Sequence, residues 1–264
     1  MPKERVDVLA FNQGLFETRE KAKRGVMAGI VVSEKNGERY DKPGEKIDDA
    51  TELRIKGETL KYVSRGGLKL EKALQVFDID LEGRTVLDIG SSTGGFTDVS
   101  LQSGAKMVYA LDVGTNQLAW KLRQDERVVV MEQTNFRYSE LKDFPERPDF
   151  SCIDVSFISL GIILPNLFQI LKDDGEVVAL IKPQFEAGRE LVGKKGIVRD
   201  AKVHEDVVEQ IAGLARGLGF ATLGLDYSPI RGGAGNIEFL LYLKKGGKSI
   251  DLQIAEIVKK AHEL

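Results

Sequence analysis

The feature that most constrains this chain is the segment 86–96, which reads VLDIGSSTGGF. The apolar run at 85–90 predicts a buried strand with an acid near its end, and the pattern at 96–101 predicts a helix. The small residues between them predict a tight turn, in which glycine lets backbone N–H groups approach a ligand that a Cβ would push away. A strand, a glycine-rich turn and a helix form the nucleotide-binding corner of a doubly wound α/β sheet.

A second sign of a nucleotide site is an acid about 20 residues further on, where a carboxylate accepts both hydroxyls of a ribose. Residues 108–112 predict a second strand that ends in Asp112. The glycines depart from the G-x-G-x-x-G spacing of a dinucleotide site, and Asp88 lies too close to suit an anionic pyrophosphate. The spacing therefore favours the zwitterionic S-adenosylmethionine, while NAD and a glycine-rich turn without a ligand stay as alternatives. The residues expected to bind the cofactor lie at or after the ends of the first four strands: Asp88, Gly90, Ser91, Ser92, Thr93, Gly94, Gly95, Phe96, Asp112, Val113, Asn135 and Asp154.

The rest of the sheet is predicted by strand patterns that alternate with helices, as an α/β fold requires. Further strands are expected at 127–131, 150–155, 176–181, 221–227 and 237–243, with helices at 160–171, 203–218 and 249–264. Only the turn 229–236 separates the last two strands, so they are expected to pair antiparallel. Seven strands with an antiparallel last strand indicate a Rossmann-like methyltransferase sheet, because a plain dinucleotide fold is all parallel.

The chain length of 264 residues suggests about two domains. We expect a small α+β unit at 1–58, a linker at 59–64, the methyltransferase sheet at 65–246 and a terminal helix at 247–264. Within the first unit, Thr18 is expected to cap a helix, and 36–37 is expected to turn a hairpin.

The first unit resembles the small RNA-binding module known from a ribosomal protein, called the αL motif. The matching segments are 5–7 (RVD), 18–22 (TREKA), 27–29 (MAG), 31–32 (VV) and 36–37 (NG). The resemblance favours phosphate contacts over a plain solvated helix surface. The candidate RNA-binding residues are basic and lie in this unit or directly after the linker: Arg5, Arg19, Lys21, Lys23, Arg24 and Arg65.

Composition limits the other classes of function. The formal net charge is −3, so no global basic field calls for a nucleic-acid partner, and local charge must be considered instead. One cysteine, Cys152, allows no intrachain disulfide and suits a reducing cytoplasm, where we expect this protein. Because the chain has only two histidines, His204 and His262, in addition to this cysteine, we expect no zinc or other metal site. No apolar run approaches the roughly 20 residues of a membrane span.

Four charged residues are expected at the ligand-binding edge of the sheet. Asp154 ends the fourth strand, Lys182 ends the fifth, Glu238 lies near the start of the last, and Lys69 lies in a helix before the first. Ligands bind at the carboxyl ends of strands in such sheets. Each of these residues alone also fits an ordinary solvated charge, but apolar strands seldom end in charge without a reason.

This Lys–Asp–Lys–Glu set suits attack by a ribose 2′-hydroxyl on a methyl sulfonium. A lysine acts as the base only when burial or a second cation lowers its pKa, and Lys69 would be that cation beside Lys182. Asp154 would orient Lys182 and face the sulfonium, and Glu238 would hold Lys69 or the ribose. Val-Ser-Phe follows Asp154 where transfer to a base nitrogen would favour Pro-Pro-Tyr or Pro-Pro-Trp.

Residues 1 to about 245 resemble the TlyA family of ribosomal-RNA 2′-O-methyltransferases, which is related to the FtsJ/RrmJ group and often labelled as hemolysins. The segments that carry this resemblance are 19–22 (REKA), 64–70 (SRGGLKL), 88–96 (DIGSSTGGF), 154–159 (DVSFIS), 182–186 (KPQFE) and 235–238 (GNIE). The family's catalytic tetrad carries over to Lys69, Asp154, Lys182 and Glu238. The resemblance implies methylation of cytidine riboses in ribosomal RNA or ribosomal subunits.

Three further interpretations stay open at this point. The glycine- and lysine-containing segment 184–199 is either a basic flap over the site or a plain surface loop, and Trp120 is expected in the core. The family label also suggests a membrane-active hemolysin, which we rank low because no strongly amphipathic cationic helix is predicted. A catalytically silent RNA-binding assembly factor is the third, and the intact tetrad argues against it.

Overall fold

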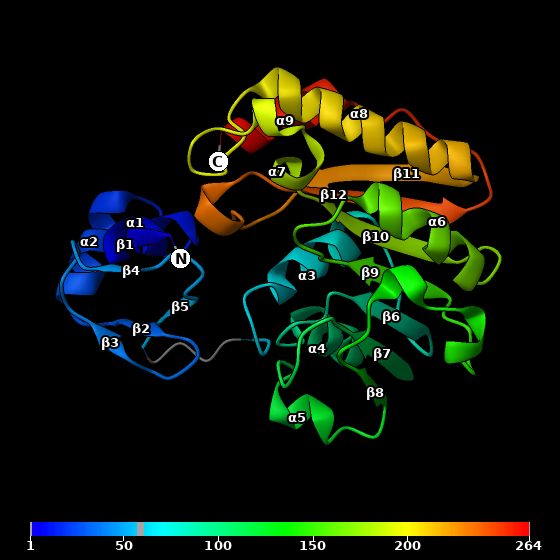
Figure 1. Cartoon of the computed structure of the whole chain (residues 1–264), viewed down its shortest axis with the longest axis horizontal. Helices are drawn as coiled ribbons and strands as arrows, with labels where there is room; N and C mark the ends of the chain where they lie inside the picture. The colour runs from blue at the N-terminus through cyan, green and yellow to red at the C-terminus, as the bar shows by residue number, and fades with distance from the viewer. Residues whose placement is uncertain (1, 57–60, 264) are drawn as a thin grey trace.

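A seven-stranded sheet forms the larger part of the molecule (Figure 1). The computed structural model describes residues 2–56 and 61–263, so part of the predicted linker, 59–60, and the end of the first unit, 57–58, lie outside the described residues. The strands of this sheet are β6 (Thr85–Ile89), β7 (Met107–Leu111), β8 (Val128–Met131), β9 (Phe150–Ile153), β10 (Glu176–Ile181), β11 (Phe220–Tyr227) and β12 (Phe239–Lys245).

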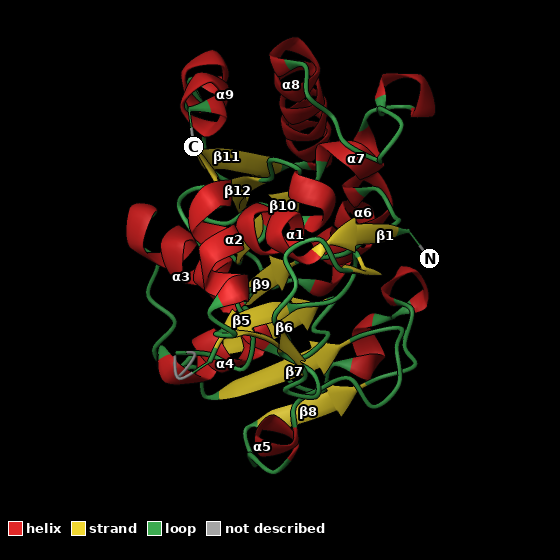
Figure 2. Ribbon diagram, turned by 90° about the vertical axis from the view of Figure 1, so that its left-hand side faces the viewer, coloured by secondary structure: helices red, strands yellow, loops and turns green. Residues whose placement is uncertain are grey.

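The strand order is β11-β12-β10-β9-β6-β7-β8, which Figure 2 shows as one continuous sheet. Strand β12 pairs antiparallel with both β10 and β11, and the other pairs are parallel. The predicted methyltransferase sheet with an antiparallel last strand is therefore confirmed.

Helices cover both faces of the sheet because its central strands are apolar on both sides. In β10, Val177 and Ala179 pack on the same face as α6 and α8, and Val178 packs on the face of α3 and α4. The helices of this part are α3 (Gly67–Val76), α4 (Gly95–Gln102), α5 (Trp120–Arg123), α6 (Leu160–Ile170), α7 (Pro183–Glu186), α8 (Ala201–Leu218) and α9 (Ile254–His262). Short 3-10 helices are η1 (Phe136–Tyr138), η2 (Leu141–Asp143), η3 (Arg189–Leu191) and η4 (Gly233–Gly235).

The N-terminal unit, drawn blue in Figure 1, has a small apolar core of its own. Its elements are β1 (Lys3–Arg5), α1 (Val6–Asn12), α2 (Arg19–Met27), β2 (Val31–Ser33), β3 (Arg39–Tyr40), β4 (Lys46–Asp48) and β5 (Leu53–Ile55). Thr18 caps α2, because its Oγ1 accepts the N–H of Lys21 at 3.2 Å. Strands β3, β2 and β5 form one antiparallel sheet, and β1 pairs with β4.

Two expectations about single elements are wrong. Trp120, expected in the core, leaves 71% of its surface exposed because it begins the one-turn helix α5 at the sheet edge. The terminal helix begins at Ile254 rather than 249, since the Asp251 side chain accepts the N–H of Gln253 and forms a turn there instead. Cys152 is fully buried. Among residues 2–56 and 61–263, no helix combines the length and the apolarity that crossing a bilayer requires.

Candidate active site

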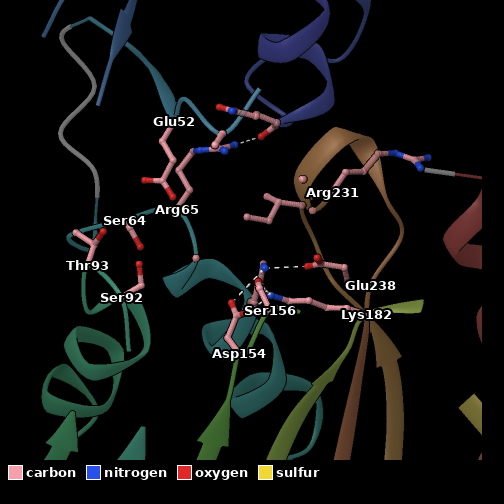
Figure 3. Close-up of a pocket in the computed structure, with 18 of the residues that line it drawn as sticks. Glu52, Ser64, Arg65, Ser92, Thr93, Asp154, Ser156, Lys182, Arg231 and Glu238 are labelled. Atoms are coloured by element: carbon pink, nitrogen blue, oxygen red, sulfur yellow. Dashed lines mark hydrogen bonds and ion pairs between the residues drawn. The ribbon is translucent and has the colours of Figure 1, made fainter. Parts of the chain in front are cut away.

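Four charged side chains from separate elements meet at the carboxyl edge of the sheet. Figure 3 labels three of them, Asp154, Lys182 and Glu238. Lys69 comes from α3, Asp154 follows β9, Lys182 follows β10 and Glu238 precedes β12. Lys69 Nζ lies 2.8 Å from Glu238 Oε2 and 3.3 Å from Asp154 Oδ2. The sheet topology therefore gathers all four residues that the sequence singles out.

The second lysine shares one carboxylate with the first. Lys182 Nζ lies 2.5 Å from Asp154 Oδ1 and donates to Ser156 Oγ at 3.0 Å. Sequence reasoning did not name Ser156 as a site residue. Its position two residues after Asp154, beyond the end of a buried strand, is the signal that could have identified it.

Burial makes this network electrostatically strong. The exposed fractions of the side chains are 9% for Lys69, 10% for Lys182, 20% for Asp154 and 2% for Glu238. Burial works against a charged Lys69, but the Asp154 and Glu238 carboxylates outweigh it and raise the pKa of Lys69 above its ordinary value. Burial likewise opposes a charged Asp154, yet Lys182 and Lys69 hold the pKa of that carboxyl well below its usual range.

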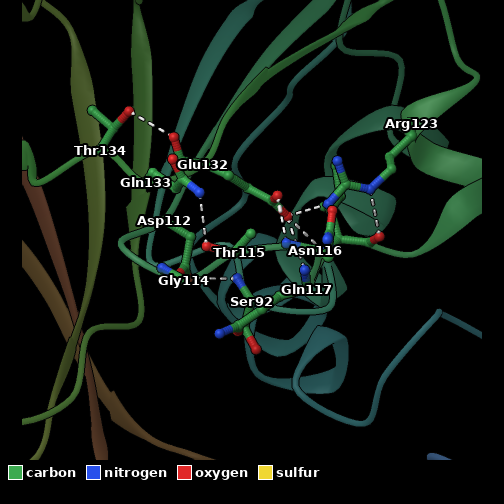
Figure 4. Close-up of polar contacts among 11 residues, drawn as sticks. Ser92, Asp112, Gly114, Thr115, Asn116, Gln117, Arg123, Glu132, Gln133 and Thr134 are labelled. Carbon is green, nitrogen blue, oxygen red and sulfur yellow. Dashed lines mark hydrogen bonds and ion pairs between the residues drawn. The ribbon is translucent and has the colours of Figure 1, made fainter.

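The glycine-rich turn lets the ends of β6 and β9 approach closely. At Gly90, where φ is +86°, a Cβ would lie 2.5 Å from the backbone oxygen of Asp154. The same turn reaches the second predicted acid, since Ser92 N–H donates to Asp112 Oδ2 at 2.8 Å. Gly114 N–H donates to the other oxygen of Asp112 at 2.7 Å (Figure 4).

Two buried polar atoms beside this turn lack a hydrogen-bond partner within residues 2–56 and 61–263. Asp88 accepts a hydrogen bond from Thr97 Oγ1 at 2.6 Å through one carboxylate oxygen, while its Oδ1 and the hydroxyl of Ser91 have none. Burial, with Asp154 and Asp112 nearby, raises the pKa of Asp88 to about 7. Unsatisfied buried acceptors fit a ligand that brings N–H donors or positive charge. The amino-acid end of S-adenosylmethionine is such a ligand, so these residues fit the predicted cofactor.

A cavity of about 290 Å³ opens in front of the four charged residues, between the sheet and the N-terminal unit. The residues that line it and were predicted for the site are Lys69, Gly90, Ser91, Ser92, Thr93, Gly95, Phe96, Asp154, Lys182, Glu238 and Arg65. Asp88, Gly94, Asp112, Val113 and Asn135 do not line it. The Asn135 side chain instead accepts the N–H of Arg137 at 3.1 Å and caps η1.

The predicted RNA-binding residues lie in two different environments. Arg65 is withdrawn into the joint between the units, where its guanidinium donates to the backbone oxygen of Gln13. The side chain of Gln13 in turn bonds the backbone of Thr51 and Leu53, at 2.7 and 2.9 Å. The predicted residues of the N-terminal unit lie at its surface, partly or fully exposed: Arg5, Arg19, Lys21, Lys23 and Arg24. Arg5 and Arg19 pair with Asp7, and Lys21 pairs with Glu17.

The segment 184–199 is anchored at both ends. Glu186 accepts the hydroxyl of Ser159 at 2.6 Å, and Asn236 bonds the backbone of Val198 and Gly196 at 3.0 and 2.8 Å. Lys195 lies 3.4 Å from Glu4 of the N-terminal unit. Within the described parts of the chain, no group of three or more His, Cys, Asp or Glu side chains is arranged to hold a metal ion.

An exposed aromatic residue directly follows Ser156, the hydrogen-bond acceptor of Lys182. Phe157 is 90% exposed and has φ of +63°, a conformation that residues with a Cβ seldom adopt. Its ring centroid lies 4.9 Å from that of Phe185. Sequence reasoning missed this residue, although it lies three positions after Asp154.

Comparisons with known proteins agree with this geometry. Residues 62–245 match a protein family described as FtsJ-like methyltransferase. The protein named "Putative rRNA methyltransferase YqxC" of Bacillus subtilis is 58% identical over 268 residues, which cover 99% of this chain and 95% of that protein. The "16S/23S rRNA (cytidine-2'-O)-methyltransferase TlyA" of Mycobacterium tuberculosis is 42% identical over 241 residues, covering 91% and 89%.

Solved structures give the same result. The structure described as "Putative hemolysin from Streptococcus thermophilus" superposes with a TM-score of 0.84 at 65% sequence identity, covering 100% of this chain and 97% of that one.

Proposed function

The chain belongs to the FtsJ-like methyltransferase family, and we propose that it transfers the methyl group of S-adenosylmethionine to the 2′-hydroxyl of a cytidine ribose in ribosomal RNA. The observation that carries this proposal is the buried network of Lys69, Asp154, Lys182 and Glu238 at the edge of the cavity. The names of the relatives supply the substrate, and the network supplies the chemistry. A substrate in ribosomal RNA also implies that the protein acts in the cytoplasm.

The two lysines are suited to different tasks in this reaction. S-adenosylmethionine supplies an electrophilic methyl group on a sulfonium when it is bound. Lys69, between two carboxylates, stays charged, because those carboxylates raise its pKa. Lys182 bonds only Asp154 and Ser156 among the described residues, which leaves one position on its Nζ for the ribose. We assign Lys182, as the uncharged amine, to take the proton of the 2′-hydroxyl while that oxygen forms its bond to the methyl carbon, the carbon–sulfur bond breaks and S-adenosylhomocysteine leaves. Lys182 then releases the proton to solvent.

Asp154 and Glu238 hold these lysines in position. One Asp154 oxygen orients each lysine, and the second partner of Lys69 is the buried Glu238. Alignment of the hydroxyl with the methyl and sulfur atoms is expected to supply much of the rate, as it does where reacting groups are held in line. Ser156 completes the orientation of the Lys182 amine.

The cofactor would lie along the glycine-rich turn. Asp112 is suited to the ribose hydroxyls, Asp88 and Ser91 to the amino-acid end, and Val113 and Asn135 to the adenine side. The unsatisfied atoms of Asp88 and Ser91 support this orientation.

The RNA would approach across the cavity from the N-terminal unit. The exposed basic residues of α2, Lys23 and Arg24 among them, suit contacts to the phosphate backbone. Phe157 offers an exposed aromatic face for an unstacked base beside the site. A ribosomal subunit or free ribosomal RNA would supply an RNA segment with such a backbone and an unstacked base.

The alternatives do not account for the charged network. Two lysines and two carboxylates are costly to bury, and neither a hemolysin nor a silent assembly factor requires them at one point. The network is the reason why catalysis is the better proposal.

The test is transfer of labelled methyl from S-adenosylmethionine to ribosomal subunits and to naked ribosomal RNA from an unmodified strain. Wild type should yield labelled 2′-O-methylcytidine, and Lys182→Ala should yield none while it still binds S-adenosylhomocysteine. Lys172→Ala is the matched control, because Lys172 pairs with Asp149 away from the cavity. A Lys182→Ala variant with wild-type activity would refute the proposed base, and no label on any substrate would refute the proposed reaction.

A further inference from the structure

A single carboxylate organises the loop that follows β7. Glu132, directly after β8, accepts the backbone N–H of Asn116 at 2.7 Å through Oε2, and those of Gln117 and Leu118 at 2.9 and 3.1 Å through Oε1. It also pairs with the guanidinium of Arg123 (Figure 4). Four donors from a loop and a helix thus converge on one side chain.

The loop held by Glu132 is tied to the proposed cofactor site at both of its ends. At its start, Gly114 N–H donates to Asp112 Oδ1 at 2.7 Å. The segment that carries Glu132 also contacts Asp112, because Thr134 N–H donates to the backbone oxygen of Asp112 at 2.9 Å. At its far end, Ala119 N–H donates to the backbone oxygen of Thr93 in the glycine-rich turn at 3.0 Å. Any shift of this loop therefore moves both the acid proposed for the ribose and the turn proposed for the rest of the cofactor.

The loop and the segment after β8 each contain a residue in a backbone conformation that non-glycine residues seldom adopt. Asn116 has φ of +53°, in the left-handed region, and Gln133 has φ of +54°. Gln133 adds a hydrogen bond from its Nε2 to Thr115 Oγ1 at 3.1 Å. The N–H of Asn116 is one of the groups that Glu132 accepts, so the carboxylate stabilises the strained residue directly.

The Glu132 side chain is built to stay charged in this position. Only 11% of its surface is exposed, and Arg123 beside it is 21% exposed. The hydrogen bond from Arg123 outweighs burial and, with the three backbone donors, lowers the pKa of Glu132 to about 2. The carboxylate is therefore ionised throughout the pH range in which the protein would work.

We infer that Glu132 is a positioning residue for cofactor binding: it fixes the loop 113–118 so that Asp112 and the glycine-rich turn present one preformed surface to the adenosine half of S-adenosylmethionine. The inference rests on the proposed function. Glu132 itself need not contact the cofactor or the RNA. The partners of Glu132 among the described residues are Asn116, Gln117, Leu118 and Arg123, and none of them lines the cavity in front of the four charged residues. Its effect should therefore be confined to the cofactor.

The test compares Glu132→Gln with wild type in S-adenosylhomocysteine binding by calorimetry and in methyl-transfer kinetics. The amide keeps the shape of the side chain but turns an N–H₂ group toward backbone donors and Arg123. We expect about tenfold weaker binding and about a tenfold higher KM for S-adenosylmethionine. The kcat at saturating cofactor and the KM for RNA should change by less than about twofold.

Two further variants separate positioning from plain stability. Glu146→Gln is the matched control, because Glu146 likewise combines an accepted hydrogen bond, from the Thr85 hydroxyl, with an ion pair, to Lys106, but does so away from the cavity. It should lower the melting temperature without changing cofactor affinity. Glu132→Asp keeps the charge on a shorter side chain. It should weaken cofactor binding and raise the KM for S-adenosylmethionine by about threefold, with kcat and the KM for RNA nearly unchanged. This variant keeps the test decisive if Glu132→Gln does not fold.

The outcomes are distinguishable. Unchanged cofactor affinity in folded Glu132→Gln or Glu132→Asp, or a loss of kcat and RNA binding equal to the loss of cofactor binding, overturns the positioning role and leaves the proposed function standing. Wild-type protein that does not bind S-adenosylhomocysteine overturns the proposed function, and this inference with it.

Discussion

Lys69 and Lys182 share Asp154 but differ in what their loss would leave behind. Replacing Lys69 leaves Glu238, 2% exposed, without its cation, whereas replacing Lys182 leaves Asp154 still paired with Lys69. An unpaired buried charge is strongly destabilising. Within the same network, Lys69 therefore has mainly a structural role and Lys182 is the proposed base.

We predict that Lys69→Met lowers the free energy of unfolding by about 3–5 kcal/mol. Lys182→Met should lower it by only about 1 kcal/mol. Both variants should lose methyl transfer. Urea denaturation of the two variants, with wild type as reference, measures the difference, and equal destabilisation by both would contradict the division of roles.

A second prediction concerns Asp88, whose pKa burial raises from 3.8 to about 7. Between these two values the folded protein holds a proton that the unfolded chain has released, so stability falls as pH rises through this window. The full effect is on the order of 4 kcal/mol. Asp88→Asn cannot release that proton, so the ligand-free variant should be more stable than wild type at pH 8 and lose the decline. Denaturation at several pH values decides this, and parallel curves for both proteins would refute it.

At the scale of elements, the two histidines of the chain join α8 to α9. His204 Nδ1 lies 2.9 Å from His262 Nε2, and the ring of His204 packs 5.6 Å from that of Phe239. Burial and the neighbouring His262 lower the pKa of His204 from 6.5 to about 4, with Arg231 adding to this and Asp200 opposing it. The contact therefore favours a neutral His204 ring.

We predict that this contact weakens in acid. Below pH 6.5, His204 binds a proton in the unfolded chain but stays unprotonated in the folded protein. The free energy of unfolding therefore falls as pH drops from 6.5 to about 4. His204→Phe keeps a packed ring that cannot titrate and should lose this decline, which is on the order of 3 kcal/mol. Asp88 acts in the opposite direction over much of this window, so the comparison is best made in the Asp88→Asn background. A wild-type slope that persists in His204→Phe would contradict the assignment.

The strands of the sheet follow from the sequence more closely than other elements do. Strand β10 has the predicted bounds, because six consecutive residues, apolar after the first, are closed by Lys182 and Pro183. The three-residue strands β1 and β4 were not expected, since neither is long enough to show an alternation. The prediction that Trp120 lies in the core was wrong for another reason, because the hydrophobicity of a residue does not reveal that it lies at the edge of the sheet.

The residues of the candidate site also differ in how well the sequence predicts them. The charged residues at strand ends are visible in sequence because an apolar run makes each of them conspicuous. Ser156, Phe157 and Glu132 lie on loops, where no periodicity marks a residue and only the packing of distant segments gives it a role. Glu132 shows this best, since its partners lie 9 to 16 positions away.

At the scale of the whole molecule, the cavity belongs to both units. Its walls include Leu9, Asn12 and Gln13 from the N-terminal unit and the loop 230–234 between β11 and β12. In Figure 1 this loop extends from the sheet toward the blue N-terminal unit. A joint of this kind links the position of the RNA-binding surface to the reacting groups.

Arg65 connects the two units at this joint. It precedes α3, the helix that carries Lys69, and its guanidinium donates to Gln13 of the other unit. Burial lowers the pKa of Arg65, while Glu52 and Glu34 counter this. A guanidinium withdrawn in this way is better suited to holding the two units in register than to contacting phosphates from the surface.

We predict that Arg65→Ala separates RNA use from cofactor use. Methyl transfer should lose about tenfold or more in kcat/KM for RNA, because the two walls of the cavity no longer hold a fixed spacing. Binding of S-adenosylhomocysteine should stay within about twofold, since Asp112 and the glycine-rich turn keep their contacts. Arg127→Ala is the matched control: Arg127 pairs with Asp125 far from the joint and should change neither quantity. If Arg65 instead contacts RNA directly, Arg65→Ala should also flatten the salt dependence of RNA binding by about one phosphate contact, whereas a residue of the joint leaves that slope unchanged.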